Sequence, residues 1–187
     1  MLMAAGLLLA AGLPRAQEIA FDGARFEAAR SLGGDTLLCN GVGKRTILFF
    51  DAYHAALYAG ARYADFDALR QADQPRILEL RLLRDAPLSL LEKVVTDGIR
   101  DNAPPGALPG LQARTQMLLA TMRAVRSLNK GDVLEIVYTG GATHLKINQA
   151  RVGADIAGKD FNDALLSIWL GAHPIDSGLK RQLLGMK

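Results

Sequence analysis

The sequence contains a single cysteine, Cys39, and this scarcity excludes two kinds of architecture. One thiol cannot form a disulfide within the chain, and it cannot supply the cysteine ligands of a zinc site. Exported domains with a core of this size do not require disulfides, so the lone cysteine is compatible with secretion. We expect Cys39 to be a small residue of the core.

The chain is also poor in aromatic residues and has no dense cluster of basic ones. Aromatic residues make up 6% of the 187 residues, and the formal net charge is +3. The lysines and arginines are scattered along the chain rather than gathered in blocks. Nucleic-acid-binding surfaces usually combine a basic patch with aromatic side chains, so we predict no nucleic-acid partner.

The apolar run over residues 2–13 is too short to span a bilayer, which takes roughly 20 residues. It is followed by Ala16, a small residue at a position typical of signal-peptide cleavage. This pattern predicts a signal peptide over residues 1–16 and a periplasmic mature protein that contacts the membrane only through the signal segment. A disordered or buried N-terminal helix is the alternative interpretation. The sequence does not indicate an oligomeric state.

No repeat or linker divides the rest of the chain, so residues 17–187 are predicted to form a single domain. Residues 19–84 alternate in the manner of strands, with "TILFFDAYHAALYA" as one long central strand. Asp85 is expected to cap a helix that begins near Pro87, and a second helix is expected from about Leu111. The segment "VLEIVYTGGATHLKIN" then predicts a β-hairpin, and two further helical segments follow it. This order predicts an α+β fold with an antiparallel sheet and helices packed on one face.

The segment "CNGVGKRTILFF" at residues 39–50 resembles a phosphate-binding loop but lacks its essential residues. Leu38 stands where the first glycine of that loop belongs, and Arg45 stands where a serine or threonine must hold magnesium. The residues that follow predict a strand instead of the helix that would face a phosphate. A nucleotide site is therefore excluded, and we predict no cofactor and no metal. The Asn40-Gly41 dipeptide favours a turn, and we predict that "GVGKR" is a turn that delivers Arg45 to the end of a strand.

Three segments together resemble the bacterial branch of the chalcone isomerase-like family. They are "NGVGKRTILFFDAYHAALYAG", "LRLLRDAPLSLLEKVVTDGI" and "FNDALLSIWLGAHPIDSGLKRQLLG". The resemblance extends over roughly residues 20–186 and implies the open-faced β-sandwich of that family.

The resemblance also implies positions for site residues. The plant isomerases have an arginine after the glycines, which matches Arg45, and a threonine on the next strand, which falls at Tyr53 here. Their tyrosine and asparagine, seven residues apart on a helix, fall at Leu90 and Asp97. Leu90 cannot donate a hydrogen bond, and Asp97 carries a negative charge, so the resemblance gives little support to an isomerase acting on a phenolic enone.

Another branch of the family binds fatty acids without catalysis, and the resemblance implies the same arginine with a hydroxyl as the carboxylate site. We therefore expect a non-catalytic protein that binds a fatty acid or a similar amphipathic molecule through Arg45 and Tyr53. An isomerase or lyase, and an accessory interaction protein without a small ligand, remain alternatives.

Several details of this site follow from strand periodicity. Arg45 and Tyr53 are separated by an even number of residues and should face the same side of one strand, with Lys44 on the other side. Ile47, Phe49 and Leu90 are expected to wall an apolar pocket. A buried guanidinium needs a counter-charge, for which Asp97 is the first candidate and Asp51 the second.

Overall fold

The computed structural model describes residues 17–186, so the signal peptide expected at residues 1–16 lies outside the described residues. A seven-stranded sheet forms the centre of this part of the chain. Its strands in spatial order are β11 (Ala150–Ala157), β10 (Ala142–Ile147), β9 (Val133–Thr139), β6 (Arg76–Leu82), β5 (Phe50–Ala59), β4 (Asp35–Ile47) and β3 (Ala29–Leu32). Every neighbouring pair is antiparallel, as predicted.

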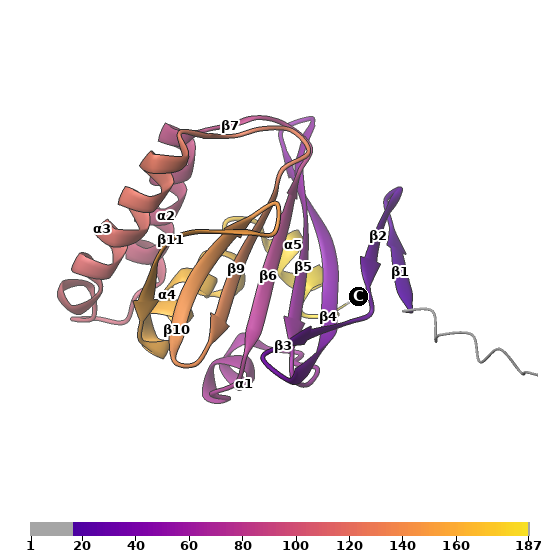
Figure 1. Ribbon diagram of the computed structural model, residues 1–187, viewed down its shortest axis with the longest axis horizontal. Coiled ribbons are helices and arrows are strands. Elements are labelled where there is room, and N and C mark those ends of the chain that lie inside the picture. Colours follow the sequence, from indigo (N-terminus) through magenta and orange to yellow (C-terminus); the bar gives the residue numbers. More distant parts are fainter. Residues whose placement is uncertain (1–16, 187) are drawn as a thin grey trace, which may run out of the picture.

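The helices of the described chain are α1 (Phe66–Gln71), α2 (Leu88–Asn102), α3 (Leu108–Val125), α4 (Lys159–Leu170) and α5 (Ser177–Leu183). Leucine and isoleucine side chains from all five of these helices pack on apolar residues of β5, β6, β9 and β10. Figure 1 shows α2, α3 and α4 on one side of the sheet. The α+β prediction with helices on one face is therefore confirmed.

The opposite face of the sheet is covered by a separate hairpin, β1 (Glu18–Phe21) and β2 (Ala24–Glu27). Its Phe26 packs with a second group of buried residues, which comprises Leu37, Cys39, Ala56, Tyr58, Ile77 and Val137. Because this hairpin covers β6, that strand is buried on both faces, although its sequence alternates like a strand with one exposed face. Even Glu79 of β6 is buried, and it accepts a hydrogen bond from Arg30. Cys39 is a core residue, as expected.

One turn and one helix start show how reliable the local sequence signals are. Gly140 and Gly141, with φ of 60° and 76°, form the predicted tight turn between β9 and β10. The helix cap predicted at Asp85 is wrong, because α2 begins directly after Pro87 without a side-chain cap. Asp85 instead accepts a hydrogen bond of 2.7 Å from the Lys130 backbone N–H.

Two short strands, β7 (Ala86–Pro87) and β8 (Ser127–Leu128), pair with each other beside the start of α2. They connect the end of α3 to the segment that leads from the sheet into α2. Over residues 17–186, no helix is both long and apolar enough to cross a membrane.

Candidate functional site

Arg45 and Tyr53 lie directly opposite each other, but on two strands rather than one. The predicted single central strand is wrong, because the chain reverses at Leu48 and Phe49, between β4 and β5. Arg45 of β4 pairs in register with Tyr53 of β5. Directly opposed residues of an antiparallel pair point to the same face of the sheet. The two side chains therefore share one face, as expected, for a different reason.

The glycines before Arg45 do not form the predicted turn; residues 39–45 are part of the continuous strand β4, with an irregularity between Cys39 and Gly41. Their role is to let α5 approach the sheet. A Cβ atom on Gly41 would lie 2.1 Å from the Gln182 carbonyl oxygen, and one on Gly43 would lie 2.7 Å from Leu179 Cδ1. The amide of Asn40 donates a hydrogen bond of 2.7 Å to the Leu183 carbonyl in the same contact.

Tyr53 connects Arg45 to the helical layer. Its hydroxyl accepts a hydrogen bond of 2.8 Å from Trp169 Nε1 on α4. Burial raises the pKa of Tyr53, while the positive charge of Arg45 and the Trp169 hydrogen bond partly oppose this increase. The phenol is therefore neutral near pH 7 and keeps a proton that it can donate to an anionic ligand.

Arg45, Leu90 and Asp97 line the same groove, so the structure brings together three of the four positions that the family resemblance implied. The fourth, Tyr53, does not line the groove but lies beside Arg45. The groove has a volume of about 600 Å³ and lies between α2 and the segment 172–175. Leu90 is 43% exposed on its wall. Sequence reasoning missed the part that His173, Pro174 and Ile175 play in closing this groove, because they follow α4 and are distant from Arg45 in the chain.

Neither carboxylate expected to balance Arg45 does so. Asp97 pairs with Lys93 and with Arg100 on its own helix, at 2.5 and 2.7 Å. These two cations lower the pKa of Asp97 below its usual value. Asp51 pairs with Lys44 at 2.9 Å, on the opposite face of the sheet.

Arg45 is thus a half-buried cation that has no ion pair among residues 17–186. Lys44 alternates to the other face, as expected, and also pairs with Asp22 at 2.8 Å. The charge of Lys44 is therefore balanced by two carboxylates, whereas the charge of Arg45 is not balanced by any carboxylate of the described residues.

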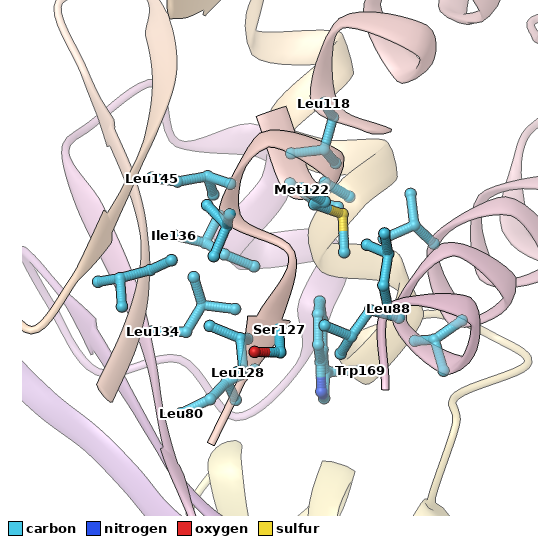
Figure 2. Close-up of a pocket in the computed structure, with 16 residues that line it drawn as sticks. Leu80, Leu88, Leu118, Met122, Ser127, Leu128, Leu134, Ile136, Leu145 and Trp169 are labelled. Carbon is cyan, nitrogen blue, oxygen red and sulfur yellow. The ribbon is translucent and has the colours of Figure 1, made fainter. Parts of the chain in front are cut away.

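A second, apolar cavity lies behind Trp169, with a volume of about 70 Å³. Figure 2 shows leucine side chains of the sheet on one side of it, with Trp169, Met122 and Leu88 among the residues on the helical side. Val94 of α2 lines both this cavity and the Arg45 groove. Trp169 therefore lines the cavity and also donates a hydrogen bond to Tyr53. Its position in a helical apolar stripe gave no signal of that role.

The expected walls of the apolar pocket are partly wrong. Ile47 and Phe49 lie at the β4–β5 turn, where Phe49 is 91% exposed, and neither lines the cavity. Leu90 lines the groove instead. The cavity walls come from residues that carry no chemical signature in the sequence, among them Leu80, Leu134, Ile136 and Leu145.

Two further reactive side chains, Cys39 and His54, are buried on the side of the sheet that the β1–β2 hairpin covers. Burial raises the pKa of Cys39 to about 11, so its thiol is protonated and unreactive near neutral pH. His54 is buried on the hairpin side, where its Nε2 lies 3.0 Å from Asp22 Oδ2. Over the described residues, no three histidine, cysteine or acidic side chains converge in a way that could hold a metal ion.

The family model described as chalcone isomerase-like matches residues 17–185. The chain belongs to the chalcone isomerase-like family. Among solved structures, it is similar to the fatty-acid binding protein AtFAP1 of Arabidopsis thaliana, with a TM-score of 0.69 and 15% sequence identity. That match covers 90% of this chain and 96% of the plant protein, so the two share their fold over nearly their whole lengths. No curated protein sequence matches the chain.

Proposed function

We propose that this chalcone isomerase-like protein binds a fatty acid or a similar amphipathic carboxylate without chemical conversion. The observation that carries the proposal is Arg45, a cation without a carboxylate partner in the described chain, beside the buried hydroxyl of Tyr53. A guanidinium donates two parallel hydrogen bonds to a carboxylate, and a neutral phenol donates a third. The fatty-acid binding stated for AtFAP1 is further support, since the two proteins share a fold.

The alkyl chain of such a ligand would run from the groove toward the apolar cavity. Val94 borders both spaces, and Trp169 separates the cavity from the Tyr53 hydroxyl. The cavity of about 70 Å³ is much smaller than the ~300–1,000 Å³ of typical small-molecule sites. We therefore propose that side chains of α2 and α3 move outward when a long chain enters.

Binding is better supported than isomerisation because the two helix positions implied for substrate recognition, Leu90 and Asp97, offer no hydrogen-bond donor. Leu90 is apolar, and the Asp97 carboxylate is occupied by Lys93 and Arg100. An enone carbonyl that gains negative charge in the transition state needs hydrogen-bond donors, and a carboxylate would repel that charge. The groove beside Arg45 also supports a small ligand over an accessory role without one.

Trp169 provides a direct assay because it is the only tryptophan of the chain and lines the cavity. A fatty acid brominated near the middle of its chain should quench Trp169 fluorescence, since bromine quenches indole only at close range. A saturable titration supports the proposed site. Native mass spectrometry of protein purified without delipidation checks whether a fatty acid is already bound. A protein that is empty and whose fluorescence does not respond to the brominated acid contradicts the proposal.

Replacing Arg45 by alanine should weaken binding of the brominated fatty acid by about 1.5–3 kcal/mol, the contribution of a hydrogen bond to a charged group. That loss corresponds to a dissociation constant roughly 10- to 100-fold higher. The maximal quenching should stay the same, because the cavity around Trp169 is unchanged. The measurement is the fluorescence titration in wild type and variant at equal ionic strength.

Lys44→Ala is the matched control, since Lys44 is the preceding residue on β4 and its charge lies on the opposite face. It should leave the dissociation constant within about twofold of wild type. Equal weakening by both variants would mean that general positive charge, and not the Arg45 site, attracts the ligand. The fatty-acid methyl ester, which lacks the carboxylate charge, should bind both variants alike.

We further propose that the protein is exported and that cleavage follows Ala16. The apolar run over residues 2–13 and the small residue at position 16 support this location. N-terminal sequencing of the mature protein from a periplasmic extract should begin at Gln17. A soluble cytosolic protein that retains Met1 would contradict export.

A further inference from the structure

The turn between β4 and β5 exposes a group of apolar side chains at one end of the sheet. Residues 47–50, here named the apolar tip, are Ile47, Leu48, Phe49 and Phe50. Leu48 is 84% exposed and Phe49 is 91% exposed. The tip lies at the end of the long β4–β5 pair that is uppermost in Figure 1. An exposed apolar patch on a folded domain commonly marks an interaction site.

The composition of this turn is unlike that of an ordinary two-residue hairpin loop. Such loops favour asparagine, aspartate and glycine, because these residues adopt positive φ readily and are solvated well. Here Leu48 has a φ of 55°, in the left-handed region that side chains such as leucine rarely adopt. The chain therefore has apolar residues at a position where both solvation and backbone conformation favour polar ones.

Two cations lie on the segments beside the apolar tip. The guanidinium of Arg84 stacks on the Phe50 ring at 4.2 Å. The 129–132 loop is adjacent, since the Gly131 N–H donates to the Leu82 carbonyl and the Lys130 N–H donates to Asp85. Neither Arg84 nor Lys130 forms an ion pair within residues 17–186.

The acidic residues at this end of the molecule are already engaged by other groups. Asp51 pairs with Lys44, and Asp85 accepts a backbone hydrogen bond. Asp132 accepts hydrogen bonds from the Asn129 backbone and the Asn148 side chain. Arg84 and Lys130 therefore lack local carboxylate partners, and they flank an apolar projection. This combination matches the layered chemistry of an anionic membrane surface, with phosphates outside and acyl chains beneath.

The size and shape of the tip argue against a protein partner as its main occupant. Four side chains of this size expose on the order of 500 Å², whereas a stable protein interface buries about 800 Å² per partner. The tip is also narrow, because β4 and β5 extend past the end of their pairing with β3 at Leu38 and with β6 at Tyr53. A lipid surface requires no complementary shape and accepts a small convex apolar group.

We propose that the apolar tip inserts into an anionic phospholipid surface, with Arg84 and Lys130 contacting the headgroup phosphates. Arg45 lies two residues before the tip on β4, so the insertion brings the groove that contains Arg45 to the membrane. An amphipathic ligand could then pass between membrane and groove without crossing bulk water. The membrane contact itself does not depend on the proposed fatty-acid binding.

The test measures flotation of the full chain with vesicles that contain phosphatidylglycerol and no free fatty acid. The variant Leu48→Asn/Phe49→Ser should lower the vesicle partition coefficient at least tenfold. Asparagine suits the positive φ at position 48, so the fold is retained, which thermal unfolding checks. The control Leu108→Asn/Met117→Ser makes equivalent changes at two exposed apolar residues of α3 and should partition like wild type. All proteins are purified from the same periplasmic extract, so they share one N-terminus and any contribution of residues 2–13 is the same in each.

A charge variant tests the second half of the proposal. Arg84→Gln/Lys130→Gln should weaken partitioning several-fold on phosphatidylglycerol vesicles at low salt, and not on phosphatidylcholine vesicles. The control Arg62→Gln/Arg181→Gln removes two other exposed arginines and should have little effect.

Equal partitioning of the tip variant and its α3 control would overturn the proposal. So would a tip variant that changes the sedimentation mass while vesicle binding is unchanged, because the tip would then join copies of the chain.

Discussion

Replacing Arg76 by methionine should lower the free energy of unfolding by about 3–5 kcal/mol, the range for breaking a buried ion pair. The Arg76 side chain is 1% exposed, and it pairs with Asp163 of α4. Its Nε donates a hydrogen bond of 2.6 Å to Asn162, and its Nη1 donates to the Leu69 carbonyl of α1. One side chain thus joins α1 and α4 to strand β6. Methionine fills the space but leaves these acceptors without a donor.

Chemical denaturation with linear extrapolation measures this loss, and the melting temperature should fall by roughly 10 °C for a domain of this size. Arg70→Met is the matched control, since Arg70 forms an exposed pair with Asp67 on α1. Exposed pairs contribute at most about 1 kcal/mol, so the control should change stability little. A loss below 1 kcal/mol for Arg76→Met would show that the buried pair contributes nothing net.

Replacing Gly41 by alanine is expected to lower the free energy of unfolding by about 3 kcal/mol or more. The new methyl group would lie 2.1 Å from the Gln182 carbonyl oxygen and 2.6 Å from that of Leu183. These are backbone atoms of α5, so no side-chain rotation removes the overlap. The helix has to move away from β4, and the hydrogen bond from Asn40 to the Leu183 carbonyl is lost with it.

Gly110→Ala on α3 provides the comparison for this substitution. A Cβ at Gly110 meets no atom within 4 Å, and the residue is helical. Alanine there should raise the free energy of unfolding by about 0.4–1 kcal/mol, because it restricts the unfolded chain. Near-neutral behaviour of both variants in denaturation would mean that α5 adapts to the added methyl. Hydrogen exchange of the α5 amides should show faster exchange in Gly41→Ala and unchanged exchange in Gly110→Ala.

The proposed ligand site and helix α5 both lie against strand β4. The glycines that admit α5 precede Arg45 on the same strand, and Gln182 of α5 accepts a hydrogen bond from the Lys44 backbone N–H at 3.0 Å. The motif "NGVGKR" therefore has two structural roles, one at its beginning and one at its end. Its first part allows a helix to lie against the strand, and its last residue presents a guanidinium to the groove on the helical side.

Local patterns in the sequence were enough to predict most of the secondary structure and the fold class. The period of two along β6, the spacing of apolar residues on α2 and the Gly140-Gly141 turn each depend on residues a few positions apart. Such signals arise from side-chain direction and backbone conformation, which are properties of the local chain. The resemblance of three segments to the chalcone isomerase-like family added the position of Arg45.

Only the tertiary structure decided what surrounds those residues. The sequence predicted a turn at Gly41, yet a helix about 140 residues later determines the role of that glycine. It offered Asp97 as the counter-charge of Arg45, yet two cations on the same helix, at spacings of three and four, are closer to Asp97. The burial of Arg76 and the connection of Trp169 to Tyr53 likewise join segments far apart in the chain. Close approach and choice of ionic partner depend on distances between such segments, and no local pattern encodes them.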